Sequence, residues 1–346
     1  DINQTGFILA NWTWNPATYQ GTFAFRNNTI ILDGDYYVKV TLTDLANKSS
    51  SDTVYIHIDT QKPIVTITLP QNDYYFDSQA NIWINGTFVE RNFNLTRLLD
   101  INQTGFILAN WTWNPATYQG TFAFKNSSAL ADNKYSIKVS ITDLAGKTGY
   151  ATVYFTVDTV PPVVDITYPT NGQHSKTAAI WINGTVTELN KDGHEPYINN
   201  TAFLRIFWNG THFAFQNNTI IPDSLISLKV NFTDLAGKTG FDTVYFTLDT
   251  TPPIVSITNP TPGAYVDSVA EIWINGTVTE LNINGQLPLI NNTDFSRIVW
   301  IPATGVFAFR NYTAIPDGSI SISVNFTDLA GNTGSATRTF TIDTVY

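Results

Sequence analysis

The chain has 346 residues and carries 28 Asp and Glu against 18 Lys and Arg, a net charge of −10. This balance argues against a nucleic-acid-binding protein, because few basic side chains are available to neutralise phosphates. Hydrophobic residues make up 43%, enough for a core, and no apolar run approaches the roughly 18 residues of a membrane helix. Cysteine is absent, which excludes disulfides and Cys-bound zinc. Methionine is absent too, and we therefore expect a processed product or a fragment.

The sequence repeats itself with a period of 90–100 residues, which matches a small β-sandwich. The motif Asp-Thr-x-x-Pro begins at Asp59, Asp158 and Asp249, and Asp343 begins a shortened copy. Residues 1–25 are identical to residues 100–124, which indicates recent duplication and a longer array. We therefore predict four segments: 1–60, the later part of a domain without its first strands, and complete domains at 61–159, 160–250 and 251–346.

Each repeat is predicted to consist of half-buried antiparallel strands. Apolar residues alternate with polar ones, as at Ile226, Leu228, Val230 and Phe232. A period of two with one apolar face is typical of such strands, and Gly, Asn, Asp and Pro separate them every 8–12 residues, as in a sandwich. In segment 1–60 the apolar face includes six residues without predicted cover: Val38, Val40, Leu42, Val54, Ile56 and Ile58.

The stretch VNFTDLAGKTGFDTVYFTLDTTPPIVSIT resembles the junction between two bacterial or archaeal immunoglobulin-like (Big-type) repeats. Such repeats form tandem arrays in surface adhesins, filaments and envelope proteins. The resemblance covers the whole chain and implies an all-β fold of tandem immunoglobulin-like sandwiches in an extended array. Tyr36 and Tyr135 match the family's tyrosine near strand F, whereas Ile226 and Ile320 depart from it.

No catalytic motif stands out. The four histidines occupy unrelated repeat positions, without metal-ligand spacing, and no nucleophile elbow or phosphate-binding glycine loop is present. We therefore expect a protein that is not an enzyme.

The sequon Asn-x-Ser/Thr is unusually frequent and predicts N-glycosylation. It occurs 18 times, at Asn3, Asn11, Asn27, Asn47, Asn85, Asn94, Asn102, Asn110, Asn126, Asn183, Asn199, Asn209, Asn217, Asn231, Asn275, Asn291, Asn311 and Asn325. The strand phase predicts an outward position for Asn183, Asn231 and Asn325. We expect sugars above all at the recurrent Asn126, Asn217 and Asn311. The alternative is crowding of Asn and Thr in turn-rich repeats.

Two groups of tryptophans allow alternatives. Trp83, Trp181 and Trp273 each lie two residues before a sequon and either cover neighbouring strands or pack against a first sugar. The run NWTWNPATYQ at Asn11 and Asn110 is a sugar-binding platform, a contact to another chain, or a packed strand extension.

The connectivity implied by the resemblance brings three carboxylates to each junction. The predicted sets are Asp59 with Glu90 and Asp143, Asp158 with Glu188 and Asp234, and Asp249 with Glu280 and Asp328. Oxygen-rich clusters suit Ca²⁺, and related adhesin arrays use calcium at linkers. The alternative is that these Asp residues form Asx turns.

The leading hypothesis is a non-enzymatic, glycosylated extracellular structural protein, one stretch of a rod or filament on a prokaryotic and specifically archaeal cell surface. Prolines at 63, 161–162 and 252–253 would stiffen its linkers. Its expected partners are N-linked glycans and copies of itself or the rest of a longer array, with no nucleic acid and no membrane span. The alternatives are the stalk of a surface adhesin and the non-catalytic part of a surface hydrolase.

Overall fold

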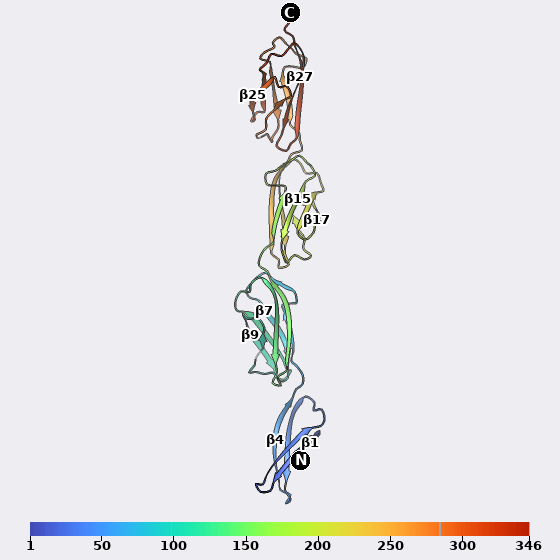
Figure 1. Cartoon of the computed structure of the whole chain (residues 1–346), viewed down its shortest axis with the longest axis vertical. Helices are drawn as coiled ribbons and strands as arrows, with labels where there is room; N and C mark the ends of the chain where they lie inside the picture. Colours follow the sequence, from blue (N-terminus) through green and yellow to red (C-terminus); the bar gives the residue numbers. More distant parts are fainter. Residues whose placement is uncertain (98, 284, 346) are drawn as a thin grey trace. The chain divides into compact units, whose positions relative to one another are not determined.

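A computed structural model describes residues 1–97, 99–283 and 285–345, and these residues form strands and loops (Figure 1). The chain divides into two compact units, Asp1–Thr159 and Val160–Tyr346. Within the described residues, no helix has the length and apolar character that crossing a bilayer requires.

The second repeat, residues 61–159, is a sandwich of two four-stranded sheets. The first sheet has the order β5 (Ile64–Leu69), β7 (Trp83–Val89), β10 (Gln119–Asn126) and β9 (Phe106–Asn114). The second has the order β6 (Tyr74–Phe76), β12 (Thr148–Val157), β11 (Asn133–Thr142) and β8 (Asp100–Ile101). Neighbouring strands are antiparallel except β6, which runs parallel to β12. This order is that of an immunoglobulin-like sandwich, which confirms the predicted fold class.

The third repeat, residues 160–250, has the same strand order. Its sheets consist of β13 (Val163–Tyr168), β15 (Trp181–Thr187), β18 (His212–Asn217) and β17 (Phe203–Trp208), and of β14 (His174–Ser175), β20 (Thr239–Leu248), β19 (Ser224–Thr233) and β16 (Tyr197–Ile198).

The fourth repeat, residues 251–346, is built in the same way. Its sheets consist of β21 (Ile254–Asn259), β23 (Trp273–Thr279), β26 (Val306–Asn311) and β25 (Phe295–Ile301), and of β22 (Tyr265–Val266), β28 (Thr333–Ile342), β27 (Gly318–Thr327) and β24 (Leu289–Ile290).

The core of each complete repeat comes from the predicted alternation. In β19, Leu228, Val230 and Phe232 are buried, and the residues between them face outward. They pack against residues of the facing sheet such as Ile182 and Phe213. Burying one such side chain stabilises the fold by about 1.5–3 kcal/mol, so the period-two pattern determines which face of each strand forms the core.

The N-terminal segment, residues 1–60, forms two two-stranded sheets instead of two four-stranded ones. β1 (Phe7–Asn15) pairs with β2 (Gln20–Asn27), and β3 (Gly34–Thr43) pairs with β4 (Ser49–Ile58). A single bridge from Ile2 to Val40 corresponds to the β8 pairing of the second repeat. The six apolar residues of the predicted face differ in exposure. Val38 is buried, Val40, Ile56 and Ile58 are half-buried, and Leu42 and Val54 are exposed.

The tyrosine corner is present where the sequence predicts it. The Tyr135 hydroxyl donates to the carbonyl of Ala131 at 2.8 Å. The Tyr36 hydroxyl donates to the carbonyl of Leu32 at 2.9 Å. Both bonds fix the loop that precedes the long hairpin of their repeat.

Candidate cation sites and the sequon asparagines

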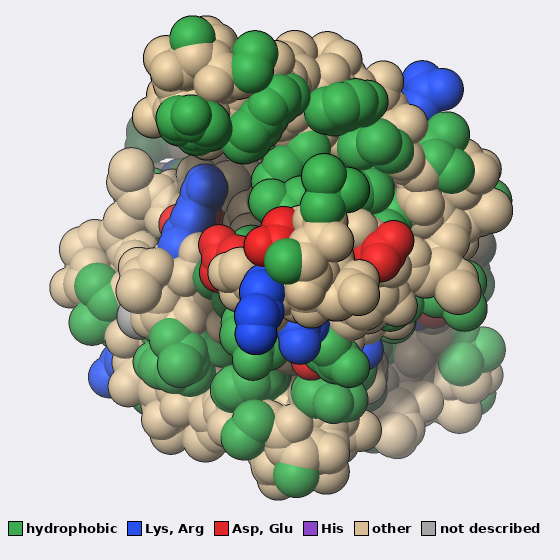
Figure 2. Space-filling view, turned by 90° about the horizontal axis from the view of Figure 1, so that it is seen from below, with side chains coloured by type: hydrophobic (Ala, Val, Ile, Leu, Met, Phe, Trp, Pro, Cys, Tyr) green, Lys and Arg blue, Asp and Glu red, His purple; other side chains and the backbone are tan. Residues whose placement is uncertain are grey.

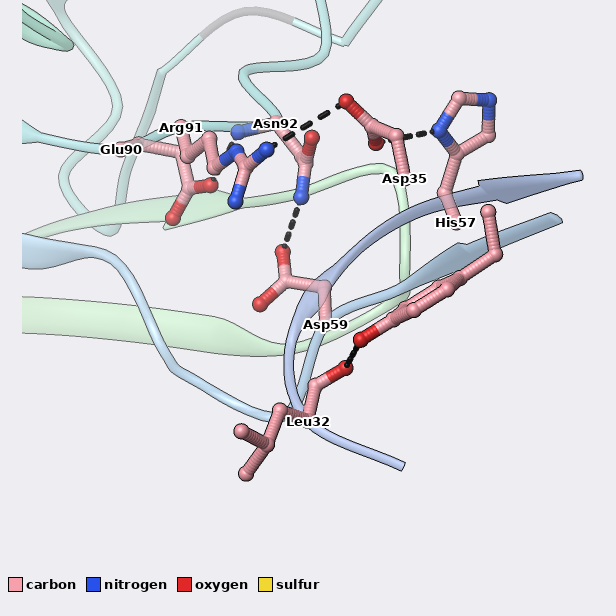
Figure 3. Close-up of polar contacts among 8 residues, drawn as sticks. Leu32, Asp35, His57, Asp59, Glu90, Arg91 and Asn92 are labelled. Atoms are coloured by element: carbon pink, nitrogen blue, oxygen red, sulfur yellow. Dashed lines mark hydrogen bonds and ion pairs between the residues drawn. The ribbon is translucent and has the colours of Figure 1, made fainter. Parts of the chain in front are cut away.

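The first predicted carboxylate set comes together within the N-terminal unit. Asp59 follows β4, Glu90 follows β7 and Asp143 follows β11. One ligand oxygen of each lies within 4.8 Å of the others. Glu90 and Asp143 are buried and Asp59 is half-buried. Figure 3 shows Asp59 and Glu90 beside Asn92, with the Asn92 amide directed at Asp59.

Each carboxylate of this set has one oxygen that accepts from a nearby backbone amide. Asp143 Oδ1 accepts from the Lys147 amide at 2.8 Å, and Glu90 Oε1 accepts from the Asn92 amide at 2.6 Å. Asp59 Oδ1 accepts from the Gln61 amide at 3.1 Å. The turn-forming role that was the alternative to metal binding is therefore real, but it occupies only one oxygen of each group.

The remaining oxygens determine what the cluster can do. Asp59 Oδ2 accepts from Asn92 Nδ2 at 2.7 Å. Asp143 Oδ2 is buried and has no hydrogen-bond partner among the described residues. Burial raises the pKa of Glu90, the charges of Asp59 and Asp143 raise it further, and the Asn92 amide opposes them. A buried acceptor without a donor costs about 1–3 kcal/mol, so this geometry fits a cation.

The third set forms the equivalent cluster within the second unit. Oxygens of Asp249, Glu280 and Asp328, which follow β20, β23 and β27, lie within 4.8 Å of one another. Asn282 Nδ2 donates to Asp249 Oδ2 at 2.6 Å. Here, unlike in the first set, Asn332 Nδ2 donates to Asp328 Oδ2 at 2.9 Å and to the Asp249 carbonyl at 2.8 Å.

The middle set draws its residues from both units and remains a prediction. Asp158 follows β12 in the first unit, whereas Glu188 and Asp234 follow β15 and β19 in the second. Within the second unit, Glu188 Oε1 accepts from the Asn190 amide at 2.7 Å and Asp234 Oδ1 from the Lys238 amide at 2.8 Å. These are the same turn bonds as in the other two sets.

A small charged network lies beside the first set. Asp35 accepts from His57 Nδ1 at 2.7 Å and from Arg91 at 3.3 Å (Figure 3). The hydrogen bond from His57 lowers the pKa of Asp35, with Arg91 contributing. Because the three side chains are exposed, Arg91 by 44% and the other two by more than 60%, the network contributes little stability.

The sequon asparagines differ widely in exposure. Nine are exposed: Asn3, Asn11, Asn27, Asn47, Asn102, Asn110, Asn199, Asn209 and Asn291. Seven are half-buried: Asn85, Asn94, Asn183, Asn217, Asn231, Asn275 and Asn325. Asn183, Asn231 and Asn325 alternate with buried neighbours, which agrees with their predicted outward phase.

The three recurrent positions at which we expect sugars above all are bonded to the backbone of their own repeats. Asn126 and Asn311 are buried and Asn217 is half-buried. Asn126 is 6% exposed, and its Nδ2 donates to the carbonyls of Gln79 and Ser128 at 2.9 and 2.8 Å. Its Oδ1 accepts from the Ile82 amide at 2.8 Å. A glycan would replace one of these Nδ2 hydrogens, so Asn126 is a structural clasp in the folded chain.

The same three-bond clasp recurs in the next two repeats. Asn217 bonds the backbone of Ala178, Thr219 and Ile180. Asn311 is buried and bonds the backbone of Val269, Thr313 and Ile272. These positions recur because each clasp secures the entry to one strand: β7, β15 or β23.

The tryptophans of the NWTWNPATYQ run in the second repeat belong to the core, as the packed-strand alternative proposes. The rings of Trp111 and Trp113 lie 5.6 and 5.7 Å from that of Phe93. Trp113 Nε1 also donates to the Glu90 carbonyl at 3.0 Å, which ties β9 to the first carboxylate set.

Two of the three outer-face tryptophans lie beside a cation of the next strand. The Lys125 ammonium lies 5.4 Å from the Trp83 ring centre, and the Arg310 guanidinium 5.5 Å from that of Trp273. Both distances are within the range of cation–π attraction. This arrangement favours the interpretation that the indoles cover neighbouring strands.

No protein-family model and no curated protein sequence matches the chain. Among solved structures, it is similar to protocadherin gamma B7 extracellular cadherin domains 1–4, with 9% identity, a TM-score of 0.39, and 97% of this chain and 91% of that chain covered. The chain is also similar to a tetra-tandem repeat in the extending region of a large adhesion protein, with 14% identity, a TM-score of 0.38, and 98% of this chain and 92% of that chain covered. It is similar as well to Sidekick-1 immunoglobulin domains 1–5, with 11% identity, a TM-score of 0.35, and 90% of this chain and 66% of that chain covered. The fold assignment rests on the chain's own strand order.

Proposed function

We propose that the chain is a non-enzymatic, N-glycosylated structural protein outside the cell. It forms a stretch of a rod or filament of tandem immunoglobulin-like domains on a prokaryotic, archaeal surface, with domains at 61–159, 160–250 and 251–346. The observation that carries the proposal is the repetition of one sandwich with a carboxylate set after the same three strands. Repeated modules provide length, and a cation at each set would fix the linker that leads into the next module.

Calcium is the cation that the donors fit best. The sets offer only oxygen ligands, and Ca²⁺ accepts six to eight oxygens at about 2.3–2.6 Å in flexible geometries. Two oxygens on opposite sides of one such ion are separated by about 4.6–5.2 Å, which is compatible with the 4.8 Å limit for the first and third sets. Nearby carbonyls and water would complete the shell.

Calcium titration of the full chain tests this part of the proposal. We expect binding by calorimetry and a rise in melting temperature that EDTA reverses. Stabilisation should reach about 2.7 kcal/mol per site at a free concentration of 100 Kd. Asp143→Asn should remove one site. Asp44→Asn is the matched control, because Asp44 makes the same turn bond and belongs to no carboxylate set among the described residues. An unchanged melting temperature in EDTA would exclude the cation role.

Glycosylation is proposed for the nine exposed sequon asparagines, with Asn110 and Asn209 as the reference positions. Asn110 lies on β9 and Asn209 in the turn before β18, and both are exposed. Peptide mapping of native material should find sugar there and bare side chains at Asn126 and Asn311. Sugar at the two buried clasps, or none at the exposed positions, would contradict the proposal.

A further inference from the structure

The outer face of the second sheet in the third repeat places one sequon asparagine between two exposed aromatic residues. Asn231 of β19 pairs with Tyr197 of β16 on one side and with Phe241 of β20 on the other. Tyr197 is 63% exposed and Phe241 is 59% exposed. Because residues directly opposite on neighbouring strands share one face of a sheet, these three side chains form one row at the surface, the Asn231 row.

Exposure alone does not distinguish these aromatic residues, because hydrophobic side chains also lie at the surface on the face shown in Figure 2. Their distinction is that a sugar acceptor lies between them. The strands that carry Tyr197 and Phe241 are two strand spacings apart, or about 10 Å. This gap admits one sugar ring with carbon contacts of about 3.5–4.0 Å to an aromatic ring on either side.

The side-chain amide of Asn231 is accessible for modification. Asn231 is half-buried, and its side chain makes no hydrogen bond to another residue in the part of the chain that the structure describes. Neither its Oδ1 nor its Nδ2 is buried without a partner, so both reach solvent. Asn217 of the same repeat differs, because its Nδ2 donates to the carbonyls of Ala178 and Thr219. Asn231 therefore carries a sugar without losing a bond.

A cation lies beside the same row. The Lys229 ammonium is 3.5 Å from the centre of the Phe241 ring, within the range of cation–π attraction. This contact holds the ring in place and brings the N–H donors of Lys229 next to it. Hydroxyl and acetamido oxygens of a sugar are acceptors for such donors. The Asn231 row thus combines an apolar platform with a hydrogen-bond donor, the two kinds of contact that a sugar makes.

The other two complete repeats each lack one part of this arrangement. In the second repeat, the aromatic residue is present as Tyr150, but Ser140 stands at the position of the asparagine. In the fourth repeat, the sequon is present at Asn325, but its partners across the strands are Leu289 and Ser335. Sequon and aromatic pair coincide in the third repeat, so the other two provide natural controls for each part.

We propose that Asn231 carries a glycan whose first sugar packs between Tyr197 and Phe241 and accepts a hydrogen bond from Lys229. The inference rests on the proposed N-glycosylation and adds a half-buried position to its exposed sites. The sugar covers both rings and connects β16, β19 and β20, so it stabilises this sheet. A sugar on Asn325 has no aromatic partner and extends into solvent.

The packing is tested on the full chain secreted from a eukaryotic host and trimmed to a single isotope-labelled N-acetylglucosamine at each occupied sequon. An aromatic ring shifts protons above its face upfield in NMR spectra, so the sugar signal that Asn231→Ser removes should lie upfield. Phe241→Ser should return it to the position of an exposed sugar. Tyr245→Ser, at an exposed aromatic of the same strand outside the row, should not move it. An unshifted signal, or one that Phe241→Ser leaves in place, would overturn the proposal.

Hydrogen exchange measures the effect of the sugar on the sheet. The trimmed chain is compared with the same chain from a bacterial host that attaches no sugar. Amides of β20 (Thr239–Leu248) should exchange about two- to tenfold more slowly with the sugar, as expected for one aromatic contact. The difference should vanish in Phe241→Ser, and β28 (Thr333–Ile342) beside Asn325 should show none. Equal exchange of β20 in the two chains means that the sugar does not pack on the row.

Peptide mapping of native material separates this inference from the proposed glycosylation on which it rests. We expect sugar at Asn231 as well as at Asn110 and Asn209. Sugar at the two reference positions with a bare Asn231 would overturn this inference and leave the glycosylation in place. Bare side chains at all three positions would overturn both.

Discussion

A single asparagine secures the entry to a strand of the first sheet in each complete repeat. Its side chain satisfies one backbone amide and two carbonyls at a place where the chain changes direction. Sequence recurrence identified these positions, but recurrence alone cannot separate a glycan acceptor from a buried clasp, since both need the same residue. The hydrogen bonds separate them, because the Nδ2 group of a clasp donates to two backbone carbonyls.

The clasp makes a prediction about stability. Asn126→Ala should lower the free energy of unfolding by about 2–3 kcal/mol, because it leaves buried backbone groups without partners. The control is Asn27→Ala, at the equivalent exposed position in the N-terminal segment, which should change stability by less than about 0.5 kcal/mol. Denaturant unfolding measures both. Equal effects would show that Asn126 has no special structural role.

Glu90 predicts a pH dependence in calcium-free buffer. The pKa of Glu90 in the folded chain is raised above the ordinary value of 4.5. At a pH between the ordinary pKa and the folded pKa, the folded chain therefore holds a proton that the unfolded chain has lost. Stability from this group should therefore fall as the pH rises above about 4.5 and remain lower beyond the folded pKa. Glu90→Gln should flatten this part of the profile in thermal melts in EDTA. Parallel profiles would contradict the assignment.

At the scale of the strands, much of the fold could be predicted. The alternation of Leu228, Val230 and Phe232 with polar residues determines which face is buried, and the tyrosine corner follows from Tyr135. The first and third carboxylate sets also follow. In the first set, the strand order brings the residues after β7 and β11 to the end of the sandwich where β5 begins, and Asp59 lies in the short linker between β4 and β5. The orientation of Trp111 and Trp113 could not be predicted, because the polar residues around them left either face open to burial.

The close contact between Gly86 of β7 and the Phe122 ring of β10 leads to a prediction for β7. Gly86→Ala should destabilise the second repeat by about 1–3 kcal/mol or more, because the added methyl meets the ring and the Thr66 carbonyl, both at 2.2 Å. Thr87→Ala, on the exposed face of the same strand, is the control and should have little effect. Chemical denaturation compares them. A tolerated Gly86→Ala would mean that β7 and β10 are less closely packed.

At the scale of the whole molecule, proline content leads to a prediction about stiffness. Pro161 and Pro162 restrict the backbone of their linker to extended conformations. For the proposed rod, replacing both with glycine should shorten the maximum dimension of the chain in small-angle X-ray scattering. Pro316→Gly, an exposed position within the fourth repeat, should leave it unchanged. If the double variant has the same dimension, the prolines do not set the stiffness.

The exact duplication of residues 1–25 at 100–124 also matters while the chain folds. Asn27 and Trp83 are 56 positions apart, whereas Val89 and Gln119 are 30 apart. Closing the longer loop costs only about 0.6 kcal/mol more, so β2 can compete with β10 for β7. During synthesis β2 leaves the ribosome first and β10 last, so the wrong pairing can form before the right one is possible. Because the β1–β2 hairpin repeats the β9–β10 hairpin, the native pairing must be favoured by strands outside the duplication, β11 and β12, whose sequences differ from those of β3 and β4.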